Sequence, residues 1–148
     1  MPAVENRPHA AFSCRMLAAW AFNKRRRDDQ PVDPDERSPQ LGIKYKDLAL
    51  LGQLQQHGAD LTQPRHVIYF SYAPSREVAQ AMGVEARERG FEVELGDPLD
   101  AYPDDWPVRC EATIALLPET VRDNTDFFEG LAGRHGAEFD GWEAAAGK

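Results

Sequence analysis

The feature that most constrains the fold is a strict alternation of apolar and polar residues in one segment. From residue 106 to residue 116 every second side chain is apolar, and most of the positions between them are polar or charged. Successive side chains of a β-strand point to opposite faces, so this period of two predicts a sheet strand with one buried face. The apolar positions are Trp106, Val108, Cys110, Ala112, Ile114 and Leu116.

Other elements are predicted on both sides of this strand. Leucines at near-helical spacing predict a helix over Tyr45–His57, with Gly58 placed as its C-terminal glycine. Ser75 is suited to cap the N-terminus of a second helix, which ends at Gly90. A third helix ends at Gly136 and begins between residues 119 and 125. The remaining predicted strands are residues 66–72, 91–95 and, as a short strand or a packed tail, 137–143.

The order of these elements predicts the fold class. After the helix at 45–57 the order is β-α-β-β-α-β, which is the split βαβ arrangement of a ferredoxin-like sandwich. We therefore predict an α+β protein with an antiparallel sheet, helices on one sheet face, and an extra N-terminal helix in front. The other face would be open to solvent or to a partner, and predominantly acidic. Its predicted side chains include Glu92, Glu94, Arg109, Glu111 and Thr113.

The charge is distributed unevenly along the chain. The formal net charge is −8, from 17 basic and 25 acidic residues. Residues 1–44 hold eight bases and six acids, which gives +2, and residues 45–148 hold nine bases and nineteen acids, which gives −10. We predict an extension over residues 1–44 and one folded domain over residues 45–148. Because direct nucleic-acid binding needs a basic surface, the acidic domain favours a basic partner instead.

The N-terminal extension carries no convincing targeting signal. Its apolar stretch, residues 10–22, is interrupted by Arg15 and too short to span a bilayer. The basic run at 24–27 follows the apolar stretch, whereas a secretory signal has its positive charges first. Residues 28–40 have the composition of a disordered linker. A cytoplasmic protein without a disulfide is expected.

Catalytic and metal-binding patterns are not recognisable. The histidines are scattered, and neither a nucleophile motif nor a glycine-rich phosphate loop occurs. The aspartates between residues 97 and 105 lack the spacing of a calcium loop. A metal cluster could also be drawn from His135, Glu138, Asp140 and Glu143, but helix-end and turn roles account for them equally well. The residues therefore predict no enzyme, no cofactor and no metal site.

The most distinctive segment is the C-terminal Gly136-Ala-Glu-Phe-Asp-Gly-Trp-Glu143. Asp140-Gly141 reads as a turn pair that would return Trp142 to the domain. There the indole would lock the C-terminus onto the sheet. The alternative, a binding hot spot centred on Trp142, stays open because Trp often anchors interfaces.

Several short motifs occur in a characteristic order: Gly58-Ala-Asp-Leu61, Pro64-Arg65, Gly90-Phe-Glu-Val93, Trp106-Pro-Val108 and Glu138-Phe-Asp-Gly-Trp-Glu143. With this order and spacing, residues 45–143 resemble the RraB-like family, the regulators of ribonuclease E activity B. The most specific mark is the last motif, formed by Glu138, Phe139, Asp140, Gly141, Trp142 and Glu143. Phe139 stands where the family more often has Tyr, and the extension at residues 1–44 is not a family feature.

The resemblance implies a small non-catalytic protein of ferredoxin-like fold that binds ribonuclease E and restrains RNA cleavage. An acidic domain suits this role because it can dock on an arginine-rich RNA-binding segment. A small-molecule-binding module with a pocket around Trp106 and Trp142 is the alternative, and an enzyme has little support. The predicted partner-binding residues are Glu92, Glu94, Glu111, Asp97, Asp100, Asp104 and Asp105.

Overall fold

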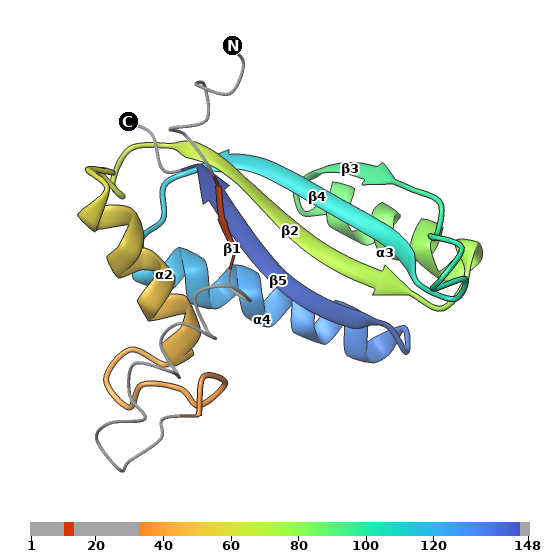
Figure 1. Ribbon diagram of the computed structural model, residues 1–148, viewed down its shortest axis with the longest axis horizontal. Coiled ribbons are helices and arrows are strands. Elements are labelled where there is room, and N and C mark those ends of the chain that lie inside the picture. The colour runs from red at the N-terminus through yellow and green to blue at the C-terminus, as the bar shows by residue number, and fades with distance from the viewer. Residues whose placement is uncertain (1–10, 14–32, 146–148) are drawn as a thin grey trace. The chain divides into compact units, whose positions relative to one another are not determined.

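The computed structural model describes residues 11–13 and 33–145 (Figure 1). These residues form an α+β fold with an antiparallel sheet, in which the strands are hydrogen-bonded in the order β1-β5-β2-β4-β3. The basic run at 24–27 and most of the apolar stretch at 10–22 lie outside the described residues. The elements are β1 (Ala11–Ser13), α2 (Tyr45–Gln56), β2 (Arg65–Ala73), α3 (Arg76–Glu88), β3 (Glu92–Leu95), β4 (Trp106–Ile114), α4 (Pro118–Arg134) and β5 (Glu138–Ala145).

The predicted elements are present, with shifted ends. The Ser75 hydroxyl accepts a hydrogen bond from the Val78 amide at 3.2 Å, which confirms it as the N-cap of α3. The alternating strand ends at Ile114 instead of Leu116. Helix α4 begins at Pro118, earlier than predicted. Proline fits a first helical position because its fixed φ is helical and its missing N–H would have no partner there.

The described residues divide into two compact units, and the first comprises residues 11–13, 33–65, 114–122 and 143–145. Its core is formed by aliphatic side chains from α2 and from the segments before and after it. The guanidinium of Arg65, itself buried, donates a 2.7 Å hydrogen bond to the carbonyl of Ala145. Strand β1 pairs antiparallel with the end of β5, with Phe12 opposite Ala144. The buried side chains include Ile43, Leu50, Leu54, Leu116 and Val121.

Residues 33–44, which include part of the segment predicted as a linker, form hydrogen-bonded turns. The Ser38 amide donates to the Ile43 carbonyl at 2.8 Å, and Arg37 and Lys44 form an isolated β-bridge. An ion pair of 2.8 Å joins Lys46 to Asp35. A domain boundary at residue 44 stays a prediction, but Ile43, just before it, is a buried residue of the first unit.

The second unit comprises residues 66–113 and 123–142. Tyr69 of β2 stacks on Phe128 of α4, with the ring centroids 4.7 Å apart. On β3, Val93 lies against Gly83 of α3, where an added Cβ would come within 3.2 Å of the valine. Figure 1 shows α3 behind β3 and β4. The buried side chains of these strands thus face α3 and α4, as the alternation predicted.

An aromatic cluster joins β5 to this helix-covered side of the sheet. The rings of Phe139 and Trp142 each lie 6.5 Å from the Tyr69 ring, although residues three apart in a regular strand point to opposite faces. The alternation is interrupted at Gly141, whose φ of 124° is accessible mainly to glycine. The predicted turn at Asp140-Gly141 is therefore wrong, because both residues lie within β5. The predicted burial of Trp142 is confirmed, with 2% of its surface exposed.

We expect Trp142→Ala to destabilise the protein by about 3–5 kcal/mol, because it removes a large side chain from a packed aromatic cluster. Chemical denaturation followed by circular dichroism measures this loss. Tyr102→Ala is the control, since Tyr102 is 60% exposed and its truncation should change stability by no more than about 0.5 kcal/mol. Equal losses for the two variants would contradict the buried role of Trp142.

Candidate polar face and acidic loop

Polar side chains gather on the sheet face opposite α3 and α4 in the second unit. In the antiparallel pairing of β3 with β4, Glu92 lies opposite Glu111 and Glu94 lies opposite Arg109. The neighbouring residues in these strands, such as Val108 and Cys110, are buried on the other face. The alternation therefore brings the predicted residues together on one surface. We call the surface formed by Glu92, Glu94, Arg109, Glu111 and Thr113 the open face.

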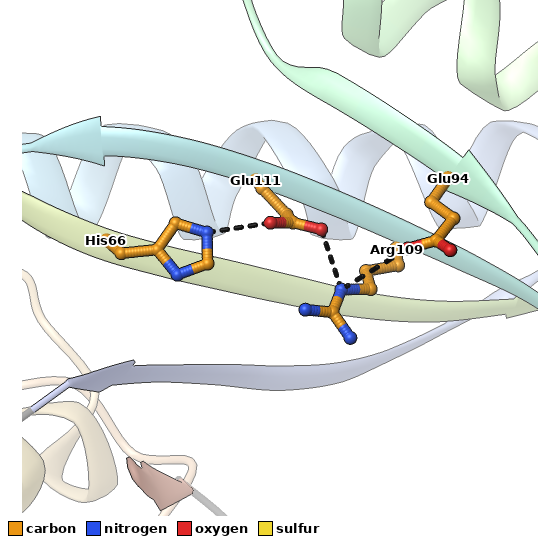
Figure 2. A network of polar contacts seen from close by, with 4 residues as sticks. All are labelled: His66, Glu94, Arg109 and Glu111. Carbon is orange, nitrogen blue, oxygen red and sulfur yellow. Dashed lines mark hydrogen bonds and ion pairs between the residues drawn. The ribbon is translucent and has the colours of Figure 1, made fainter. Parts of the chain in front are cut away.

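A network of polar contacts links three strands across the open face (Figure 2). One carboxylate oxygen of Glu111 lies 2.7 Å from His66 Nε2, and the other accepts a hydrogen bond of 2.7 Å from Arg109 Nε. Arg109 Nε is 3.9 Å from Glu94, at the limit of an ion pair. Glu111 therefore holds Arg109 closely, whereas Glu94 is weakly paired and 72% of its side chain is exposed.

The network changes the acidity of one carboxyl group. The hydrogen bond with His66 has the largest effect and holds the pKa of Glu111 below its ordinary value of 4.5. Burial is the next largest cause and raises this pKa, and the hydrogen bond from Arg109 lowers it further. Glu111 is thus kept ionised, and both of its carboxylate oxygens are engaged in contacts within the protein. Glu92, opposite Glu111 on β3, is exposed, and its side chain makes no ion pair or hydrogen bond with the part of the chain that the structure describes.

The loop between β3 and β4, residues 96–105, holds the other predicted carboxylates, and we call it the acidic loop. Within the described residues, the side chains of its four aspartates have no hydrogen bond or ion pair, and all four residues are exposed. The loop also exposes Leu99 and Tyr102, at 70% and 60%. These apolar residues were not predicted as part of the site, although two large apolar side chains among aspartates and prolines are visible in the sequence. The aspartates are Asp97, Asp100, Asp104 and Asp105.

A shallow pocket of about 300 Å³ lies where the open face meets the acidic loop, and we call it the open-face pocket. It differs from the pocket predicted around Trp106 and Trp142. Trp142 belongs to the aromatic cluster on the other face, and the Trp106 ring lies 5.2 Å from the guanidinium carbon of Arg76. Residues of β2, β3 and β4 form the pocket, so it could not be recognised from any one segment. Its lining consists of Phe70, Ser71, Tyr72, Glu94, Gly96, Pro107, Val108 and Arg109.

Other chemically reactive groups have structural surroundings. His135, directly after α4, lies 2.6 Å from Glu85 of α3, so one of its ring nitrogens is engaged in a contact with that helix. Burial raises the pKa of the Cys110 thiol to about 12, which keeps the thiol protonated and weakly nucleophilic. Within residues 33–145, no group of three or more His, Cys, Asp or Glu side chains could hold a metal ion.

The residues of the C-terminal motif all lie in β5. Phe139 and Trp142 belong to the aromatic cluster, and Gly141 permits the break in alternation between them. Glu138 is exposed at the start of the strand, and Asp140 and Glu143 are half-buried. The motif thus has a packing function in this structure, which accounts for the aromatic and glycine positions without a ligand.

A sequence model of the family described as "Regulator of ribonuclease activity B" matches residues 46–144. The chain belongs to the RraB family. The match confirms the resemblance seen in the short motifs, and it contains both the acidic loop and the C-terminal motif of this RraB-family chain. A search of curated proteins found no match.

We expect Glu111→Gln to reduce stability at pH 7 by about 0.2–1 kcal/mol, because it removes the charge that binds Arg109 and His66. The pKa of Glu111 is lowered in the folded protein, so its stabilisation is present above pH 4.5 and is lost as the pH falls through the folded-state pKa. Urea denaturation at a series of pH values should therefore show the two proteins converging in acid.

Glu92→Gln provides the matched control for this experiment. Glu92 faces Glu111 across the β3–β4 pair, and like charges directly opposite each other are unfavourable. Its neutralisation should leave stability unchanged or slightly increased at pH 7. A loss from Glu92→Gln as large as that from Glu111→Gln would refute the assigned network.

Proposed function

We propose that this RraB-family protein is a non-catalytic regulator that binds ribonuclease E, or a similar RNA-processing enzyme, and inhibits its cleavage of RNA. Family membership supports a role in regulating ribonuclease activity. The identity of the nuclease and the direction of regulation are parts of our proposal. We also assign the ferredoxin-like class, since the order β5-β2-β4-β3 is the one that a βαββαβ chain adopts in that sandwich. We also propose a cytoplasmic location, which fits such a partner. Among the described helices, none is both long and apolar enough to cross a bilayer.

The observation that carries the proposal is the exposure of carboxylates without internal partners. Among the described residues, the aspartates of the acidic loop and Glu92 make no ion pair, so forming contacts to a partner would not require breaking contacts within the protein. Leu99 and Tyr102 add exposed apolar surface to the same loop. Carboxylates around apolar anchors suit a basic protein segment, because charges guide association and buried apolar groups slow dissociation.

Inhibition by this surface requires no chemistry from the regulator. An arginine-rich RNA-binding segment attracts RNA mainly through the phosphates, so a protein that covers its guanidinium groups competes with RNA directly. The acidic loop and the open face would supply the competing negative charge. Binding should weaken as salt rises, because exposed charges are screened over about 10 Å at 0.1 M ionic strength.

The open-face pocket gives a specific reason to keep a small-molecule-binding module as the second candidate. Its volume of about 300 Å³ is at the lower end of the range for ligand sites. A ligand that raised the melting temperature of the protein, together with no binding to ribonuclease E, would favour this alternative over the proposed regulator.

The decisive experiment is a pull-down of ribonuclease E, followed by RNA cleavage with and without the protein. We expect recovery of the nuclease and slower cleavage. Asp100→Lys combined with Asp104→Lys should weaken binding at least about tenfold at low salt and reduce its salt dependence, because two attractive charges become repulsive. Both positions are exposed, so the fold should be unaffected.

The matched control is Glu77→Lys combined with Glu88→Lys on α3, the helix-covered side of the second unit. These glutamates are also exposed, and the change in net charge is identical. Equal effects of the two double variants would show that net charge alone matters and would reject the acidic loop as the binding surface. Failure to recover ribonuclease E, with cleavage unchanged, would reject the proposed function itself.

A further inference from the structure

We propose that the open-face pocket is a subsite for an arginine side chain of the partner, so that the protein recognises arginine in preference to lysine. This inference rests on the proposed function, since it specifies how the basic partner segment is recognised. It goes beyond charge attraction, because the pocket combines an acidic group with aromatic and apolar side chains in one hollow.

Neighbouring strands build the pocket mainly from residues of the same sheet face, and Ser71 and Val108, which alternate to the other face, complete the lining. In β2, Phe70 and Tyr72 alternate to the same face as His66, and His66 contacts Glu111 on the open face. In β4, Pro107 alternates to the same face as Arg109, and Glu94 of β3 lies opposite Arg109 in the register. The residues of this face that line the pocket are Phe70, Tyr72, Glu94, Pro107 and Arg109. The hollow therefore has aromatic side chains on one strand and a carboxylate two strands away.

Gly96 keeps this end of the pocket open. A Cβ at this position would lie 3.4 Å from Pro107 Cγ, so a larger side chain would project toward the proline and fill the space beside it. The amide of Gly96 donates a 3.2 Å hydrogen bond to the Pro107 carbonyl, which fixes the backbone where β3 leads into the acidic loop. The shape of the hollow is thus set by backbone pairing as well as by side chains.

The charge around the pocket favours a cation. Arg109 also lines it and balances the charge of Glu94 within the lining, but Arg109 Nε is bound at 2.7 Å to Glu111 just outside it, and the formal charges of Glu94, Arg109 and Glu111 add up to −1. Glu94 is only weakly paired at 3.9 Å, so it can accept hydrogen bonds from a guest. Glu92 and Asp97, exposed on the same strand and just beyond it, add further negative charge. An anionic ligand would meet repulsion from these groups.

Arginine fits this combination better than lysine does. A guanidinium is planar, stacks on aromatic rings and binds a carboxylate through two parallel hydrogen bonds. The ammonium of lysine is strongly hydrated and has no flat face to place against Phe70 or Tyr72. The aromatic rings and the carboxylate of the open-face pocket thus distinguish arginine from lysine, whereas the acidic loop attracts both.

The test compares a short Arg-Ser repeat peptide with the matched Lys-Ser peptide, each labelled and titrated with the full-length protein by fluorescence anisotropy. We expect the arginine peptide to bind about two- to fivefold more tightly. Glu94→Gln and Tyr72→Leu should each bring the ratio of the two affinities close to one. Glu94 is so exposed that its neutralisation leaves the fold intact, and this variant decides the outcome if Tyr72→Leu fails to fold.

Glu88→Gln on α3 is the matched control, and it should lower both affinities slightly without changing their ratio, because its charge is remote from the open face. Equal binding of the two peptides to the unmodified protein, or a preference for arginine that persists in Glu94→Gln, would overturn the arginine subsite. The proposed function would still stand in that case if ribonuclease E were recovered. Conversely, a preference abolished by Glu94→Gln would support the subsite even if ribonuclease E itself did not bind.

Discussion

The packing of one ring, that of Tyr69, sets the two faces of the second unit. The ring stacks on Phe128 and meets the edge of Phe91 at 5.5 Å, and its buried hydroxyl accepts a hydrogen bond from the Asn124 amide at 3.1 Å. Burying such a ring gains several kcal/mol, on the order of 4 at about 25 cal/mol per Å². Because side chains alternate along β2, this burial also directs Phe70 and Tyr72 to the opposite face. The candidate site is therefore a geometric consequence of the core.

The polar network on the open face has more effect on geometry than on stability. Exposed ion pairs contribute at most about 1 kcal/mol, so the contact of Arg109 with Glu111 adds little to the total. Its main consequence is that the only arginine of β4 is directed to Glu111 and leaves Glu94 weakly paired. The sequence alone places three acids and one base on this face and so predicts that it is acidic. The contacts show in addition which of those acids remain available to bind a partner.

The sequence predicted the parts of the fold that depend on local patterns and missed those that depend on neighbours across the sheet. The alternation from residue 106 to residue 116 correctly predicted a strand with one buried face, and Ser75 correctly marked a helix start. Asp140-Gly141 was misread because a glycine at positive φ serves equally in a turn and in an interrupted strand. The contact of His66 with Glu111 and the open-face pocket join separate strands, so no single segment contained them.

In the proposed complex, the two parts of the candidate surface would meet different requirements for competition with RNA. RNA holds arginine-rich segments through phosphate charge and through stacking of its bases on guanidinium planes. A competitor that offered charge alone would replace only the first interaction and would bind lysine-rich proteins equally well. In the proposed complex, the acidic loop replaces the phosphates, and the hollow between Tyr72 and Glu94 replaces the stacked base. A surface with both elements can displace RNA from arginine while discriminating against other cations, which neither net charge nor an apolar pocket achieves alone.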